Sequence, residues 1–355
     1  MSAPTDATFD PDEVPSWLAS LFSGGIEYRS VLAGVNQDDC AVLCTAGGLL
    51  VLSTDFFNAR PLALEAGIGG LGDLGRLLVG ANLSDLCGTG AAPTALLLGV
   101  QMPRESMLSD FEELIRGVSD EARRWQLPVV GGDTKLGSSL SLYAVAVGMA
   151  ESMDELYLRM NAQPGDSLWV SGPLGGCCAA ILGLKWREFG PEDRWTKWAG
   201  DAILRPTLPL PKSRALSAKR IAHAGTDLSD GLGTDLAALC QASGVGVILD
   251  ASSIPMARVA CTVAEAMGVP DFLFAFPIGG DFQFIVTAPP DTDDDLAGLG
   301  FVRIGEITSH QTLRIRLADG RELELPTAGH RDARAGTFEE EVKHLLEALS
   351  QAMAP

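Results

Sequence analysis

The chain has 355 residues, of which 46% are hydrophobic, and a formal net charge of −20. This length and apolar content favour two domains with sizeable cores, and the acidic charge disfavours nucleic acid or an anionic membrane as the main partner. No apolar run reaches the roughly 18 residues of a membrane span. The seven cysteines form no regular framework, which favours a reduced, cytoplasmic protein.

The N-terminal half of the chain alternates candidate strands and helices. Residues 1–15 are rich in Pro, Asp and Thr and predict a flexible tail, and a short helix follows at 16–22. The apolar runs 41–44 and 49–52 predict a hairpin whose second strand ends at Asp55. Apolar periodicity further predicts helices at 71–87 and 106–125, a buried strand at 128–130 and a strand at 140–149.

The C-terminal half predicts a second α/β unit that begins near residue 159. A turn over 159–166 leads into a strand at 167–170, and a Gly-rich segment at 172–176 precedes a helix. The remaining apolar runs predict strands near 245–249, 283–287 and 300–307 and an amphipathic helix at 336–352. We therefore expect a two-domain α/β protein, with domains at 16–158 and 159–355.

Five short acidic motifs follow apolar runs, and each places a carboxylate beside a small or hydroxyl-bearing residue. They are 37–40, 53–55, 82–85, 131–134 and 227–231, which carry Asp39, Asp55, Asp85, Asp133, and Asp227 with Asp230. Mg²⁺ prefers oxygen ligands, and one or two carboxylates plus substrate phosphates complete its shell. Glycine lets phosphates approach the backbone closely. The five motifs together predict one magnesium–nucleotide site.

Each motif also has a simpler structural explanation. An Asp at a strand end is commonly a turn residue, and Asp230 could be the N-cap of a helix that opens at Gly231. Asn82, Ser84 and Asp85 could form a solvated helix face, although each costs a few tenths of a kcal/mol relative to Ala within a helix. Residues 70–75 match G-x-G-x-x-G, but no strand is predicted before them, so they indicate a Gly-rich helix entry.

Taken together, the motifs resemble thiamine-monophosphate kinase. This family belongs to the superfamily of aminoimidazole ribonucleotide (AIR) synthetase, selenophosphate synthetase and the hydrogenase maturation factor of the same fold. The matching segments stand in family order, and they are 38–43, 53–55, 81–86, 90–93, 130–134, Arg159 with 164–166, and 227–232.

The resemblance implies two AIR synthase-like α/β domains, an α/β sandwich in the second, and a homodimer whose N-terminal domains pair into a β-barrel. It implies Mg²⁺ and ATP as cofactors, with Asp39, Asp85 and Asp230 as the catalytic carboxylates. The metal ligands would be Asp39, Asp55, Asp85, Asp133 and Asp230, assisted by Thr54 and Asp227. Gly132, Asp133, Arg159 and Ser229 would contact the nucleotide. Phosphoryl transfer needs mainly positioning and charge neutralisation.

Three departures from the family lie in its acceptor site. The His expected soon after Asp55 is absent from residues 56–60, the Glu expected in the segment 279–284 is lost, and the aromatic residue near the C-terminus is not identifiable at 327–330. These departures predict that thiamine monophosphate is a poor acceptor or no acceptor at all. Arg60, Asp281 and Gln283 become the candidate acceptor contacts.

Two other functions are compatible with the same motifs. ATP could activate a substrate oxygen for ring closure or dehydration, as in other members of the superfamily. Alternatively, the chain could bind nucleotide without catalysis, although binding alone would not need so many carboxylates. Product analysis separates these functions, because only a kinase leaves a stable phosphorylated product.

Overall fold

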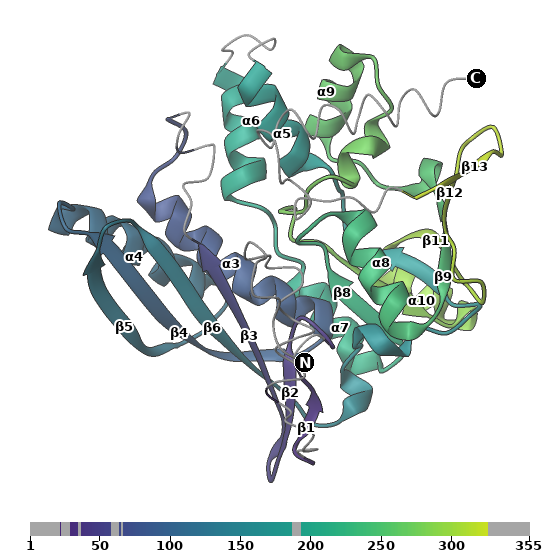
Figure 1. The fold of residues 1–355 in the computed structure, drawn as a ribbon, viewed down its shortest axis with the longest axis horizontal. Coiled ribbons are helices and arrows are strands. Elements are labelled where there is room, and N and C mark those ends of the chain that lie inside the picture. The colour runs from purple at the N-terminus through teal and green to yellow at the C-terminus, as the bar shows by residue number, and fades with distance from the viewer. Residues whose placement is uncertain are drawn as a thin grey trace, which may run out of the picture.

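The computed structural model describes residues 29–34, 37–57, 67–186 and 193–325, together with Phe22 and Leu64. Within these ranges the chain forms two α/β domains, each built on one sheet (Figure 1). This confirms the predicted two-domain α/β fold. The predicted tail, almost all of the helix over 16–22, Arg60 and the helix over 336–352 lie outside the described residues.

The first sheet contains six strands, mostly antiparallel. In spatial order they are β1 (Val31–Ala33), β2 (Ala41–Thr45), β3 (Gly48–Phe57), β6 (Ser141–Ala150), β4 (Ala92–Pro103) and β5 (Val129–Gly137). The predicted hairpin is confirmed as β2 and β3, with Val42 opposite Val51. Strand β3 runs to Phe57, two residues beyond the predicted end, because it continues to pair with β6. Strand β4 was not predicted, although it joins β6 to β5.

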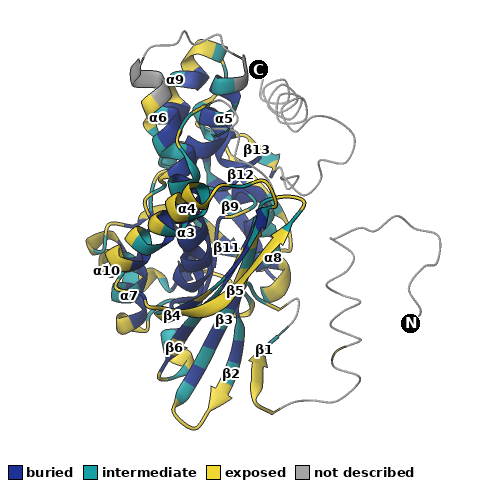
Figure 2. Ribbon diagram, turned by 90° about the vertical axis from the view of Figure 1, so that its left-hand side faces the viewer, coloured by how far each residue is buried: buried dark blue, intermediate teal, exposed yellow. Residues whose placement is uncertain are grey.

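Strand β5 is exposed along its length, which corrects the prediction of a buried strand at 128–130. The side chains of Val130 and Leu136 are each 61% exposed, and Figure 2 shows the strand in yellow at the border of the sheet. The strand is apolar, but it pairs only with β4 and so has one free edge. An exposed apolar edge strand is a template for pairing with another chain.

Two helices, α3 (Leu71–Thr89) and α4 (Leu108–Arg124), cover one face of this sheet, and both were predicted. They pack closely because Gly75 of α3 and Gly117 of α4 have no side chain; a Cβ at Gly75 would overlap the carbonyl oxygen of Leu114. Helix α3 ends at Gly90, whose φ of 82° gives the left-handed C-cap that glycine favours.

The chain passes from the first sheet to the second between Ala150 and Ser167. The second sheet contains, in spatial order, β13 (Glu322–Glu324), β12 (Leu313–Arg316), β9 (Gly246–Asp250), β11 (Val302–Thr308), β7 (Ser167–Val170), β10 (Phe284–Ala288) and β8 (Ala224–Asp227). The described helices of this half are α5 (Gly176–Trp186), α6 (Asp193–Leu204), α7 (Leu210–Lys219), α8 (Leu232–Ser243), α9 (Arg258–Met267) and α10 (Asp293–Gly298).

Alternating side chains of the second sheet enter two different cores. Leu168 and Ile285 belong to the core that contains α8. Trp169, Phe284 and Val286 belong to the core that contains α3. Helix α3 is therefore shared by the two sheets (Figure 1).

Helix α3 lies directly against β8. A Cβ at Gly88 would overlap the backbone nitrogen of Asp227, and the Tyr157 hydroxyl donates to the carbonyl oxygen of Cys87 at 2.9 Å. This contact fixes the polar residues of α3 relative to the end of β8. Among the described residues no helix is long and apolar enough to span a membrane.

Gly88→Ala should destabilise the protein by about 1–3 kcal/mol, because the added methyl group meets backbone that cannot rotate away. Gly298→Ala is the matched control, since no atom lies within 4 Å of the Cβ position there. Urea unfolding of both variants measures the difference. An unchanged midpoint for Gly88→Ala would show that α3 and β8 are not in close contact.

Candidate active site

Carboxylates from four segments meet where α3 lies between the two sheets. Asp39 precedes β2, Asp55 lies near the end of β3, Asp85 lies on α3, and Asp227 ends β8. Asp230 follows in the loop before α8. The charges act on one another: after burial, Asp227, Asp55 and Asp39 raise the pKa of Asp85, and after burial, Asp39 and Asp230 raise the pKa of Asp55. The structure thus brings together five of the carboxylates singled out in the sequence.

The polar residues within α3 face this cluster and not solvent. Asp85 accepts a hydrogen bond from the Ser53 hydroxyl, and Ser84 donates to Asp227 Oδ2 at 2.8 Å. Asn82 Oδ1 accepts the backbone N–H of Asp55 at 3.3 Å. All three helix residues are at most 9% exposed. The solvated-face explanation is therefore wrong, and the polar face of α3 connects β3 to β8.

Arg159 is the cation at the border of the cluster. Its guanidinium pairs with Asp39 and its Nε donates to Thr226 Oγ1 at 3.0 Å, while Thr226 donates to Asp39 at 2.9 Å. The backbone N–H of Arg159 donates to Asp38 at 2.8 Å. A planar guanidinium held in this way can offer paired N–H groups to a phosphate.

Burial and mutual repulsion make the cluster costly in its charged form. Burial raises the pKa of Asp55 to about 6, and Asp39 and Asp230 add to the effect. Burial followed by the Asp39 charge likewise raises the pKa of Asp38 to about 6. Burial raises the pKa values of Asp85 and Asp227 well above their usual range. One cation, Arg159, does not neutralise so many carboxylates.

The donor set fits Mg²⁺. Every side-chain donor of the cluster is an oxygen, which is the ligand type of a hard divalent cation. Asp227 Oδ1 is buried without a hydrogen-bond partner, so it has a lone pair available for a metal. In the part of the chain that the structure describes, no three acidic, His or Cys side chains are already close enough to hold an ion. Metal binding would have to draw the carboxylates together.

Asp235 is a site residue that the sequence reasoning missed. It lies in the first turn of α8, is 2% exposed, and accepts the backbone N–H of Asp230 at 3.0 Å. Burial, followed by the Asp230 charge, raises the pKa of Asp235. The helix N-cap is Gly231, so the predicted capping role of Asp230 is wrong. The available signal in the sequence was a further Asp about one helical turn after the motif 227–231.

Two predicted residues lie away from the cluster within this single chain. Thr54 points to the opposite face of β3, since side chains alternate along a strand, and its hydroxyl donates to the Ala144 carbonyl oxygen at 2.8 Å. Ser53 occupies the cluster face instead. Asp133 lies on β5, where it pairs with Lys135 at 2.9 Å and is 54% exposed.

Gly132 has a structural explanation as well as the predicted nucleotide contact. Its φ is 152°, and a Cβ there would overlap the Leu98 carbonyl oxygen, so β5 can approach β4 only with glycine at this position. Ser229 lies exposed in the loop beside Asp230, where it could reach a ligand.

Comparison with known proteins identifies the family. The model for AIR synthase related protein, N-terminal domain, matches residues 37–150, and the C-terminal domain model matches residues 163–318. The thiamine-monophosphate kinase of Methanospirillum hungatei JF-1 is 30% identical over 298 residues, which cover 83% of this chain and 92% of the relative. The chain belongs to the thiamine-monophosphate kinase family.

A second relative and a solved structure are also similar to this chain. The thiamine-monophosphate kinase of Rhodopirellula baltica is 28% identical over 321 residues, covering 86% of this chain and 93% of the relative. A solved structure described as AaThiL complexed with AMPPCP and TMP has a TM-score of 0.74 at 24% identity, covering 89% of this chain and 97% of the other, which shows the shared fold. As a member of the thiamine-monophosphate kinase family, the chain is an ATP-dependent phosphotransferase.

Asp281 and Gln283, the two candidate acceptor contacts that lie within the described residues, both hold neighbouring parts of the protein. Asp281 accepts the backbone N–H groups of Gly175 at 2.7 Å and Cys177 at 2.9 Å, and so holds the start of α5. Gln283 accepts from Ser171 at 2.8 Å and donates to the Thr207 carbonyl oxygen at 3.1 Å. Contact between these residues and an acceptor remains a prediction.

In EDTA, the free energy of unfolding of the protein should fall as the pH rises from about 4 to about 6. The pKa values of Asp38 and Asp55 rise from 3.8 to about 6 on folding, so the folded state binds more protons than the unfolded state in this window. Urea unfolding at intervals of pH measures the slope. Asp55→Asn should reduce the slope, and exposed Asp294→Asn should keep it. Stability that rises from pH 4.5 to 6.5 would contradict this account.

Proposed function

We propose that the chain transfers the γ-phosphoryl group of Mg²⁺-bound ATP to the phosphate of thiamine monophosphate. The observation that carries the proposal is the convergence of five carboxylates and one partly buried arginine between the two sheets. Supporting it, the curated relatives are thiamine-monophosphate kinases that align with most of this chain. The related AaThiL structure is described as holding AMPPCP and TMP together.

The acidic residues and the arginine of the site would have different roles. Asp39, Asp55, Asp85, Asp227 and Asp230 would hold Mg²⁺, which would neutralise the phosphates and orient the γ-phosphoryl group. Arg159 is positioned to donate to a phosphate oxygen once a metal takes over Asp39. Hydroxyl groups on β3 and α3 orient the carboxylates. No strong base is required, since positioning and electrostatic stabilisation supply most of the catalysis.

The departures from the family do not by themselves remove thiamine monophosphate as the acceptor. Asp281 and Gln283 use their polar atoms to hold neighbouring backbone, so the change in this segment alters an internal anchor. Of the other two departures, at 56–60 and 327–330, residues 58–60 and 327–330 lie outside the described residues. The relatives therefore outweigh our expectation of a poor acceptor.

With saturating Mg²⁺ and ATP, addition of thiamine monophosphate should release ADP and form thiamine diphosphate in equal amounts. Asp227→Asn should lower kcat by at least about 100-fold, comparable to the loss of one electrostatic contact in a transition state. Asp294→Asn, on the exposed face of α10, should leave kcat unchanged.

Mass spectrometry of the products decides between the candidate functions. ADP and free phosphate with a dehydrated or cyclised product would indicate ATP-driven activation. Tight ATP binding without turnover of any acceptor would indicate a nucleotide-binding protein. Either result would overturn the proposed kinase reaction.

A second copy of the chain would cover the exposed face of the first sheet. Phe56, Tyr143 and Met149 are 60%, 42% and 38% exposed on this sheet, and strand β5 has a free edge. Apolar sheet faces of this kind mark protein interfaces. We therefore propose a homodimer that is paired through the N-terminal domains.

The position of Asp133 supports a site shared between two copies. Asp55 pairs with Ala144, Ala144 with Leu98, and Leu98 with Gly132, the neighbour of Asp133. Three strand spacings of about 4.8 Å place Asp133 about 14 Å from Asp55 within one chain. We propose that Asp133 contributes to the carboxylate site of the second copy.

Mixing the inactive variants Asp133→Asn and Asp55→Asn should restore about one quarter of the wild-type activity. Half of the dimers would be mixed, and each mixed dimer would contain one intact site of two. Light scattering checks that all samples are dimers, at twice the 37.3 kDa chain mass. Unrestored activity in verified mixed dimers would place Asp133 in its own chain's site or in none.

The cysteines support a cytoplasmic location. All seven are free, and five of them are buried. Free thiols persist where the compartment is reducing, so we propose that the enzyme acts in the cytoplasm.

A further inference from the structure

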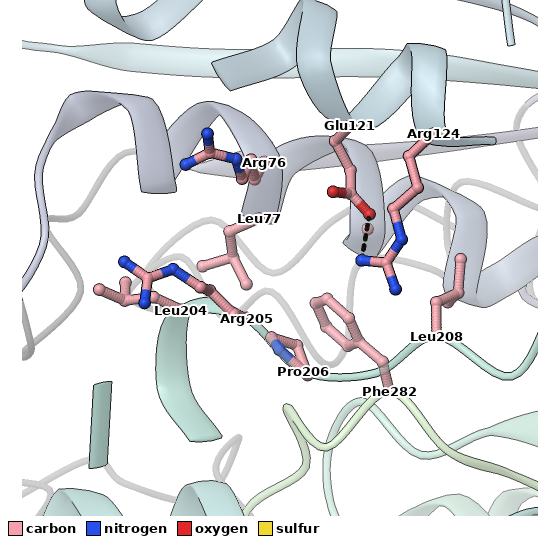
Figure 3. Close-up of a pocket in the computed structure, with 10 residues that line it drawn as sticks. Arg76, Leu77, Glu121, Arg124, Leu204, Arg205, Pro206, Leu208 and Phe282 are labelled. Atoms are coloured by element: carbon pink, nitrogen blue, oxygen red, sulfur yellow. Dashed lines mark hydrogen bonds and ion pairs between the residues drawn. The ribbon is translucent and has the colours of Figure 1, made fainter. Parts of the chain in front are cut away.

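A cavity of 380 Å³ lies between the two domains, outside the carboxylate site. It is bounded by α3, by α4 and by the segment that joins α6 to α7. The lining residues are Arg76, Leu77, Gly80, Glu121, Arg124, Leu204, Arg205, Pro206, Leu208 and Phe282. Figure 3 shows Arg76 and Arg205 on one side, Glu121 and Arg124 on the other, and Leu77, Pro206 and Phe282 between them.

The floor of the cavity is apolar and contains one aromatic ring. Phe282 has a φ of 51°, the left-handed conformation that a bulky residue rarely adopts. Its ring packs against Gly80, where a Cβ would lie 2.9 Å from a ring carbon. The ring is therefore fixed by α3 on one side, and it offers the cavity a surface on which a flat ring can stack.

The cavity is lined by three arginines and one acidic residue, Glu121, in a chain of net charge −20. Arg205 pairs with Asp73 at 2.9 Å and with Asp201 at 3.0 Å, and it is 49% exposed. Arg124 pairs with Glu121 at 3.4 Å and is 56% exposed. These pairs hold the guanidinium groups in place, and five N–H donors per arginine exceed what two such bonds use.

The segment 279–282 separates this cavity from the carboxylate site. At one end, a Cβ on Gly279 would overlap the backbone of Leu228 and Ser229, so the segment touches the active-site loop. At the other end, Phe282 lines the cavity. None of the clustered carboxylates lines the cavity, so the two sites are distinct, and they are linked by this segment and by helix α3.

We propose that the cavity is a second ligand site, for a small anion that carries a flat apolar ring. The ring would stack on Phe282, and the anionic group would accept hydrogen bonds from Arg205 or Arg124. Occupancy would act on the loop of Ser229 through the segment 279–282, and so change the affinity of the active site for nucleotide. The ligand site itself does not depend on the proposed acceptor.

The binding half is tested with 1-anilinonaphthalene-8-sulfonate, whose flat rings carry one sulfonate. Fluorescence titration in EDTA, and again with saturating Mg²⁺-AMPPCP, should give saturable binding in both conditions. Arg205→Gln and Arg124→Gln should each weaken binding by about fivefold to tenfold, as expected for a half-exposed charged hydrogen bond. Arg303→Gln, a half-exposed arginine of β11 paired with Asp293, should leave it unchanged.

The uncharged analogue N-phenyl-1-naphthylamine separates charge from apolar contact. It should bind at least about tenfold more weakly than the sulfonate, since it cannot accept from arginine. Equal affinity of the three arginine variants for the sulfonate would overturn the site. Complete displacement of the sulfonate by AMPPCP would place it in the nucleotide site, and would overturn the proposal too.

The coupling half is tested by reciprocal titration, which needs no turnover. Bound sulfonate should change the Kd of Mg²⁺-AMPPCP by at least about twofold, and AMPPCP should change the Kd of the sulfonate by the same factor. In Phe282→Leu, which keeps an apolar side chain but removes the ring, the factor should fall towards one. Independent binding of the two ligands to the wild-type chain would overturn the coupling. A failed kinase assay would leave both titrations interpretable.

Discussion

Several carboxylates held beside one another, largely out of water, are the constraint around which both sheets are arranged. Isolated in a weakly polar environment, such charges repel strongly and favour protonation. The fold supports them with hydroxyl and amide donors from β3 and α3 and with one arginine from the segment after the first domain. What remains is a net negative site that a divalent cation and a polyphosphate can complete.

The support comes mainly from one helix. Polar residues at 82, 84 and 85 would weaken an isolated helix, and here each bonds to a strand outside the helix. Ser84 bonds to the end of β8, and Asn82 and Asp85 bond to β3. Gly88 permits the close approach that these bonds need. The low helix propensity of these three residues is thus offset by hydrogen bonds that position the site.

Patterns in the sequence predicted those parts of the structure that are determined by residues close together in the chain. The hairpin of β2 and β3, helices α3 and α4, and the carboxylates that meet at the site follow from apolar periodicity and from motif position. Strand β4 was missed because its long apolar run is compatible with several structures. The exposure of β5 was missed because a strand's place at the border of a sheet depends on distant pairing. Thr54 was named from the family resemblance, which does not tell which side chains of β3 face the cluster, and the structure places Ser53 on that face.

The sharing of α3 between the two sheets has a consequence for how the protein unfolds. Trp169, Phe284 and Val286 from the second sheet lie in the same core as Leu78, Leu83 and Leu86 of α3. Neither domain can melt without exposing apolar surface of the other, so the chain behaves as one cooperative unit. Isolated halves would each present half of a core to water.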